Sequence, residues 1–227
     1  MENNKKKSLI PKAALIKAWL IWETFPQTCY NYERMMGQVV AHMFSAIIGF
    51  LYKDDPSKRK EVMKREIEFF NVHIEFGSCI LGMAVALEEQ KAMGENIPGE
   101  FITNLKTSLM GPLAGMGDTI WQGVVIPILL AVCIDLTRSG SGNVWGAVIY
   151  AVVIVVAAYA LSYWNFMFGY KAGSEAIMDF LEKGILNKLI KGASIMGCMV
   201  MGGLIVNYVK AACLSLIHIS EPTRRSY

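Results

Sequence analysis

One segment joins a candidate ligand-binding carboxylate to residues that break helices. Residues 110–118 read MGPLAGMGD, so three glycines and a proline precede Asp118. Irregular backbone at membrane depth persists only where it is buried in protein or lines a polar cavity, and there its amides can bind a small polar molecule. We expect a broken-helix loop that places Asp118 and the backbone of Gly115 and Gly117 beside a cavity. The alternative is a membrane-surface loop in which Asp118 caps the following helix.

Common catalytic motifs are absent from the sequence. There is no Gly-x-Ser-x-Gly, His-Glu-x-x-His, phosphate-binding loop or dinucleotide-binding glycine motif. The five cysteines are widely spaced without a Cys-x-x-Cys pair, and the 14 methionines form no ligand cluster, so both residue types are interpreted as packing. We expect no catalytic residue, no metal and no cofactor. A helical membrane enzyme built on Glu88, Glu89 and Asp118 is the disfavoured alternative.

The composition indicates a membrane protein. Of the 227 residues, 54% are hydrophobic and only 18% are charged, which excludes an ordinary soluble domain. A net charge of +3 is too small for a nucleic-acid binder that depends on bulk charge. Because no stretch alternates polar and apolar residues at a period of two, we expect an all-α integral membrane protein.

The sequence divides into two parts of different composition, and the change falls near residue 108. Residues 1–108 are amphipathic, and we expect partly embedded helices there at 13–23, 30–52, 55–70 and 74–91. The stretch 35–52 has nearly the length of a bilayer span, with Gln38, His42 and Ser45 on one polar face. Residues 109–213 are apolar, with a kinked or partial span at 119–134, the clearest span within 139–170 and a glycine-rich stretch at 192–209.

The C-terminal residues are expected to be foreign to the protein. Leu214 to Arg224 reads LSLIHISEPTR, which is a translation of a common transposase sequencing adapter. We therefore take 1–213 as a single truncated domain and 214–227 as a read-through tail that replaces the natural C-terminus.

Five segments together resemble a known family. They are 30–35 (YNYERM), 68–71 (EFFN), 86–92 (ALEEQKA), 110–118 (MGPLAGMGD) and 192–197 (GASIMG). In order and spacing, over about residues 9 to 210, they resemble the IID membrane subunit of the mannose/fructose/sorbose-type bacterial phosphotransferase system (PTS). The chain departs from many relatives at Trp121-Gln122 and Ile126-Pro127, which leaves the sugar preference open.

The resemblance implies a multi-pass subunit of the bacterial cytoplasmic membrane, embedded in lipid. Such a subunit joins a IIC partner in a hetero-oligomer that translocates a hexose sugar. The cytoplasmic phosphocarriers IIA and IIB hold the phosphotransfer residues, and IID carries no phosphorylated residue. The missing nucleophile fits this division, which leaves open whether the chain itself counts as an enzyme.

Candidate sugar contacts follow from the same resemblance. Asp118 and the backbone of Gly115 to Gly117 are placed near the sugar route, because a carboxylate at that depth is costly unless it is used. Asn71 and His73 precede an apolar helix, where they would either contact sugar hydroxyls or cap that helix. Trp121 would either stack on a sugar or anchor the chain at the membrane interface.

Other polar residues are given structural roles. Glu88, Glu89 and Gln90 end a helix, where acidic groups oppose the dipole, so we expect Lys106 or IIC to compensate them. Glu33 and Arg34 are expected in ion pairs buried within the complex, and His42 as a satisfied interior histidine.

Two functional hypotheses remain. The first is a subunit that contacts the sugar during translocation, and the second is a scaffold that stabilises IIC without contacting sugar. Replacing Asp118 by Asn separates them, because a scaffold should still assemble and transport normally.

Overall fold

The computed structural model describes residues 8–138 and 144–182, together with the single residues 195, 199 and 202. Throughout these ranges the regular elements are helices, which confirms the all-α prediction. They are α1 (Lys12–Thr24), α2 (Gly37–Ser45), α3 (Ile48–Leu51), α4 (Pro56–Glu66), α5 (Ile74–Ala92), α6 (Gly99–Gly117), the π-helix η1 (Asp118–Val125), α7 (Ile126–Arg138) and α8 (Trp145–Glu182).

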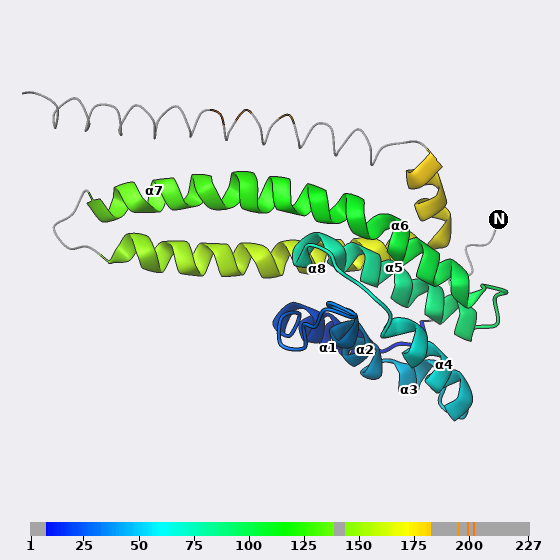
Figure 1. Ribbon diagram of the computed structural model, residues 1–227. Helices are drawn as coiled ribbons and strands as arrows, with labels where there is room; N and C mark the ends of the chain where they lie inside the picture. The colour runs from blue at the N-terminus through cyan, green and yellow to red at the C-terminus, as the bar shows by residue number, and fades with distance from the viewer. Residues whose placement is uncertain (1–7, 139–143, 183–194, 196–198, 200–201, 203–227) are drawn as a thin grey trace, which may run out of the picture.

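A long helical hairpin dominates the arrangement. Figure 1 shows α6, η1 and α7 following one another as a rod, with α8 returning beside α7. Helix α5 packs along α8, and α1 to α4 form a smaller group against one end of the hairpin (Figure 1). Among the described residues, two apolar segments are long enough to cross a membrane: Gly99–Ile134 with 36 residues and Trp145–Ala172 with 28.

The loop expected at 110–118 is not present. Helix α6 continues through Pro112 to Gly117, and the irregular backbone comes later, as the π-helix η1. Proline removes one backbone donor, and a membrane helix tolerates this loss because neighbouring groups compensate for it. The partial span expected at 119–134 is therefore the second half of the first long segment. The predicted span within 139–170 corresponds to α8, apart from residues 139–143, which lie outside the described ranges.

In residues 1–108 the structure has helices at three of the four predicted positions. Helices α1, α4 and α5 match the stretches 13–23, 55–70 and 74–91, and Asp55 caps α4 by accepting a hydrogen bond from the Lys58 amide at 2.9 Å. The single helix expected at 30–52 is wrong. Before α2 the chain instead bridges to residue 70, where the Met36 amide donates to the Phe70 carbonyl oxygen at 2.8 Å.

The polar face expected on the 30–52 helix does exist on α2, but it points outward. Gln38, His42 and Ser45 are all exposed, so His42 is not an interior histidine in this chain. Glu33 and Arg34 pair with each other at 3.2 Å, and the Glu33 side chain is 79% exposed. The stretch 192–209, apart from three single residues, and the tail at 214–227 lie outside the described residues.

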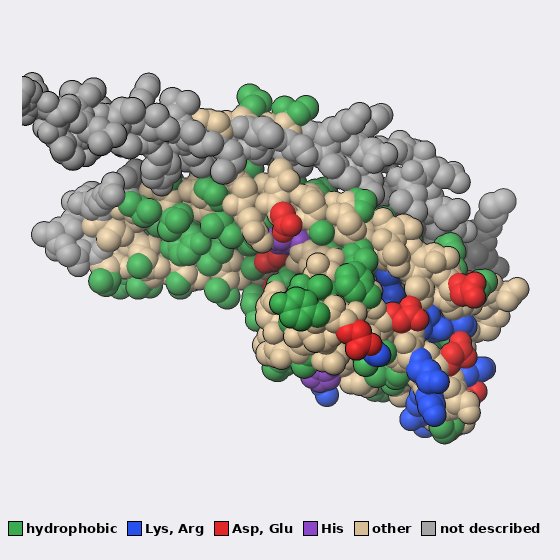
Figure 2. Space-filling model, in the orientation of Figure 1, with side chains coloured by type: hydrophobic (Ala, Val, Ile, Leu, Met, Phe, Trp, Pro, Cys, Tyr) green, Lys and Arg blue, Asp and Glu red, His purple; other side chains and the backbone are tan. Residues whose placement is uncertain are grey.

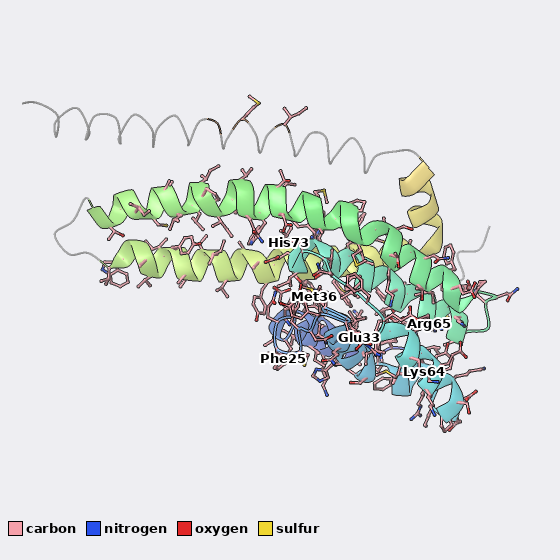
Figure 3. The ribbon with its side chains drawn as sticks, in the orientation of Figure 1. Phe25, Glu33, Met36, Lys64, Arg65 and His73 are labelled. Atoms are coloured by element: carbon pink, nitrogen blue, oxygen red, sulfur yellow. The ribbon has the colours of Figure 1, made fainter. Side chains whose placement is uncertain are left out.

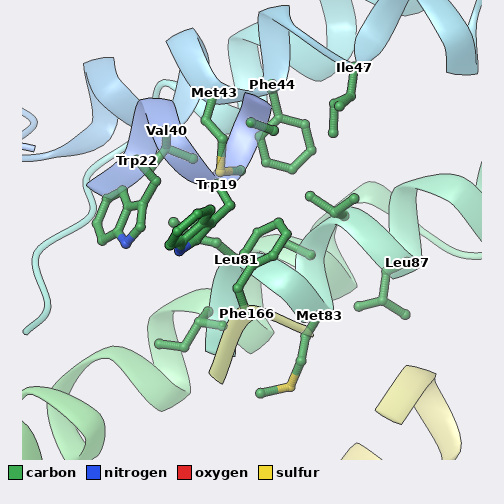
Figure 4. Packing of buried hydrophobic residues seen from close by; sticks show 14 of the residues in the cluster. Trp19, Trp22, Val40, Met43, Phe44, Ile47, Leu81, Met83, Leu87 and Phe166 are labelled. Atoms are coloured by element: carbon green, nitrogen blue, oxygen red, sulfur yellow. The ribbon is translucent and has the colours of Figure 1, made fainter. Parts of the chain in front are cut away.

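One apolar core joins α1, α2, α5 and α8. Figure 4 shows the rings of Trp19, Trp22, Phe44 and Phe166 packed together, and all four are buried. Helix α5 approaches α8 closely at Gly82, because a Cβ atom there would lie 2.1 Å from the Phe166 carbonyl oxygen. The two helix backbones are thus in direct contact.

Buried ion pairs join α4, α5 and α6. The guanidinium of Arg65 contacts the carboxylate of Glu88, and Lys106 Nζ lies 2.8 Å from Glu66 Oε2. The expectation that Lys106 compensates Glu88 is therefore wrong, because Arg65 does so. Glu89 accepts hydrogen bonds from the Leu9 and Ile10 amides at 2.7 and 3.1 Å and from the Tyr170 hydroxyl. Figure 2 shows charged side chains gathered over the α4 end of the molecule, away from the apolar hairpin.

Candidate functional site

A cavity of about 660 Å³ lies between η1, the start of α5 and the chain that follows α1. Figure 3 places His73 and Met36, two of its lining residues, where the hairpin meets the N-terminal helices. The volume is in the range of small-molecule sites. The lining residues are Gln27, Tyr30, Met36, Asn71, Val72, His73, Ile74, Glu75, Ala114, Asp118, Trp121, Gln122 and Ile126.

One face of the rod supplies the first wall. Ala114, Asp118, Trp121, Gln122 and Ile126 recur at intervals close to a helical turn, so they share a face across α6, η1 and α7. Asp118 is exposed, whereas Trp121 is only 8% exposed. Because helical backbone continues through Asp118, its side chain does not cap the helix that follows. π-Helical segments are rare and are frequent at functional sites.

The extended chain before α5 supplies the second wall. The Tyr30 hydroxyl donates to Asn71 Oδ1 at 3.2 Å, so Asn71 is held at the cavity and does not cap α5. His73 stands at the N-terminal end of α5 and also makes no side-chain cap. Its Nδ1 atom lies 2.9 Å from Glu75 Oε2, and both residues are 8% exposed.

The two predicted glycines have different surroundings. A Cβ atom on Gly117 would lie 2.4 Å from both Cβ and Cγ of His73, so the absence of a side chain lets His73 lie against the α6 backbone. Gly115 has no neighbour within 4 Å of such an atom and does not line the cavity. The structure therefore brings together Asp118, Asn71, His73 and Trp121, with Gly117 behind His73 and Gly115 outside.

The cavity suits a neutral, hydroxyl-rich molecule. Its lining includes two carboxylates, Asp118 and Glu75, but no lysine or arginine. The amides of Gln27 and Gln122 and the Tyr30 hydroxyl can donate or accept hydrogen bonds. An anion such as a phosphate ester would be repelled by the carboxylates. Among the described residues no group of three His, Cys, Asp or Glu side chains could hold a metal ion.

Sequence reasoning missed several lining residues. Glu75 lies two residues after His73 in the first turn of α5, and Gln27 follows Pro26 in the turn after α1. Tyr30 belongs to the segment 30–35 and Gln122 follows Trp121, but neither was predicted to contact a sugar. Only Glu75 carried a signal, since a carboxylate beside a candidate histidine is a common partner for it.

Comparison with known proteins decides the family. The family model described as "PTS system mannose/fructose/sorbose family IID component" matches residues 9–223 of the chain. The chain belongs to this family. The match includes most of the segment from residue 214 onward, so the foreign origin of that tail stays a prediction.

Several IID proteins are similar to this chain. The mannose-specific EIID component of Escherichia coli K12 is 38% identical over 79% of the chain, and the fructose permease IID component of Bacillus subtilis is 33% identical over 88%. The chain spans 62% of the length of the E. coli protein and 71% of that of B. subtilis.

Solved structures share the fold. A cryo-EM structure of the mannose transporter ManYZ with microcin E492 contains a chain 33% identical, with a TM-score of 0.68 over 88% of this chain and 71% of that one. A second solved structure, described as a membrane protein, has a TM-score of 0.74 and 33% sequence identity. The match covers 86% of this chain and 70% of that one. This IID chain is thus a bacterial inner-membrane protein, as predicted.

Proposed function

We propose that this IID chain forms, with a IIC partner, the translocation unit of a mannose-family sugar permease. In this proposal the cavity holds a hexose during its passage, and phosphorylated IIB, supplied by IIA, transfers phosphate to the sugar at the cytoplasmic side. The observation that carries the proposal is the cavity itself. It combines carboxylates, amides and aromatic rings beside a helical segment long enough to cross the bilayer.

Each wall offers groups that suit a sugar. Asp118 and Asn71 would accept hydrogen bonds from sugar hydroxyls, and His73 would donate or accept one according to its tautomer. Trp121 presents an aromatic ring at the cavity, on which the apolar face of a pyranose would stack. Because the lining carries two carboxylates and no lysine or arginine, it favours the neutral sugar over the phosphorylated product, which then leaves to the cytoplasm.

The proposal divides the work between subunits. No residue of this chain is assigned to phosphate transfer, and the cavity supplies recognition alone. The relatives are named for mannose, fructose and sorbose, and the cavity chemistry is common to all three sugars.

The competing hypothesis is a scaffold that stabilises IIC while all sugar contacts come from IIC. The two are separated by replacing Asp118 with Asn in the full-length protein, produced with IIC, IIA and IIB in cells that lack the endogenous system. We expect the loss of a hydrogen bond to a charged group, worth about 1.5–3 kcal/mol, to weaken sugar binding roughly 10- to 100-fold. Uptake of radiolabelled hexose as its phosphate ester measures this.

A matched control makes the same chemical change elsewhere. Asp54 is exposed in the turn between α3 and α4, away from the cavity, so Asp54→Asn should leave uptake unchanged. Co-purification of IIC should be normal for both variants. If Asp118→Asn transports at the wild-type rate while IIC remains bound, the scaffold hypothesis replaces ours.

A further inference from the structure

One face of α1 carries apolar side chains and lysines together. Lys12, Ile16, Lys17 and Leu20 recur at helical spacing on the side that faces away from the core, and we call them the α1 outer face. All four are exposed, Ile16 by 39% and Leu20 by 41%. No acidic residue lies between Lys12 and Leu20 in the sequence. The surface is therefore both apolar and positively charged.

Two tryptophans on α8 mark the extent of the membrane. Trp145 and Trp164 are each 65% exposed, and at a rise of about 1.5 Å per residue they are about 28 Å apart along the helix. Tryptophan is enriched at both membrane–water interfaces, and the hydrocarbon layer between them is about 30 Å thick. No charged residue lies between the two, and most of the large side chains exposed there are valines. This spacing places the edges of the hydrocarbon layer at Trp145 and Trp164.

Contacts with α8 place α1 at one of these edges. The Trp19 indole donates to Ser162 Oγ at 2.9 Å, and the centroids of the Trp19 and Tyr163 rings are 5.0 Å apart. Ser162 and Tyr163 are less than one helical turn from Trp164. The middle of α1 therefore stands at the level where hydrocarbon gives way to phospholipid headgroups.

We propose that the α1 outer face lies in the headgroup layer and that Lys12 and Lys17 bind the phosphates of anionic phospholipids. A helix at this level buries its apolar side chains at the boundary of the acyl chains, while the lysine side chains extend to the phosphates. Another protein surface is a poorer occupant, because the buried cores of protein interfaces are depleted of charged residues. The charge of the face is complementary to that of an anionic lipid.

Lipid bound there would stabilise the folded protein through α1. The Trp22 indole donates to the Ile74 carbonyl oxygen at 3.1 Å and to Ser78 Oγ at 3.0 Å, so α1 is held against α5 by buried hydrogen bonds. The α1 outer face keeps its geometry only while these contacts hold. Because a ligand that binds only the folded state opposes unfolding, lipid binding can be measured as a rise in the unfolding temperature.

The experiment measures thermal unfolding of the assembled complex of IIC with the full-length chain, in detergent micelles with increasing fractions of phosphatidylglycerol. Phosphatidylcholine with the same acyl chains replaces it in a parallel series. We expect the anionic lipid to raise the unfolding temperature more. Each lysine near an anionic surface strengthens binding about fivefold, so the double variant Lys12→Gln, Lys17→Gln should need about 20- to 30-fold more phosphatidylglycerol for the same rise. Lys12→Arg with Lys17→Arg should keep the wild-type response.

A matched control makes the same change on another helix. Lys60 and Lys64 are exposed on α4, away from the apolar hairpin, so Lys60→Gln with Lys64→Gln should respond as the wild type does (Figure 2). An equal loss of response in this control would overturn the proposal, as would equal stabilisation by the two lipids. If the double variant at Lys12 and Lys17 unfolds earlier without added lipid, or releases IIC, then protein covers the α1 outer face and the assignment to lipid is wrong. Sugar is absent from every measurement, so these outcomes leave the proposed function of the cavity untouched.

Discussion

Replacing Gly117 by alanine tests how the cavity wall is built. A methyl group there would lie 2.4 Å from two atoms of His73, whereas carbon atoms in contact are about 3.5–4.0 Å apart, so His73 must move by more than about 1 Å. The atoms concerned are Cβ and Cγ, which cannot swing away as the end of a long side chain can. Such overpacking costs about 1–3 kcal/mol. This exceeds the roughly 0.5–1 kcal/mol that alanine normally contributes when it replaces a helical glycine.

The chain offers a matched control two residues away. Gly115 lies in the same helix but has open space where its Cβ atom would be, so Gly115→Ala should be neutral or slightly stabilising. For Gly117→Ala we expect a lower unfolding temperature of the detergent-solubilised complex. We also expect sugar affinity to fall about 2- to 10-fold, the effect of losing one neutral hydrogen bond of about 0.5–1.5 kcal/mol. If the two alanine variants unfold and bind sugar alike, then the contact between Gly117 and His73 does not set the cavity.

Three further predictions test other parts of the structure. Gly169→Ala would place a methyl group 2.1 Å from the Cys79 carbonyl oxygen and should separate α5 from α8, so the complex should unfold at a clearly lower temperature; an unchanged temperature would contradict the close packing. Arg65→Ala should destabilise the protein by about 3–5 kcal/mol, because Glu88 is left buried without its cation, and replacing both residues by apolar ones should restore much of the loss in the same assay. Trp121→Ala should reduce hexose binding whereas Trp121→Phe should retain most of it, and equal effects on binding would rule out stacking on the ring.

Sequence patterns located the helices well where periodicity and capping agreed. Helix α4 follows an Asp-Pro pair, and α5 is bounded by polar residues, so their extents were predictable. The prediction of a single helix over 30–52 was wrong because an apolar stretch can be covered by neighbouring helices as well as by lipid. The turn before α2 depends on hydrogen bonds to residue 70, which no local pattern encodes.

The sequence predicted several residues of the cavity correctly, but not the backbone geometry that places them there. Glycine and proline at 110–118 predicted a loop, but a membrane helix tolerates one proline. The irregular backbone begins seven residues beyond the first glycine of this segment, in the π-helix that starts at Asp118. Wherever that irregularity falls, Asp118 and Trp121 keep their spacing along the chain, so they still reach the same wall. The sequence predicted that the backbone of Gly117 contacts the sugar, whereas in the structure Gly117 leaves room for His73 at the start of α5.

The length of the rod determines the depth at which a ligand would meet the cavity. The 8 residues of η1 and the 13 of α7 together rise about 30 Å, which is the thickness of the bilayer hydrocarbon. If η1 and α7 fill the apolar layer of the membrane, α6 extends beyond that layer, on the side where the charged residues of α4 lie. Asp118 then stands at the boundary between hydrocarbon and water, where a carbohydrate gives up only part of its hydration before it is bound.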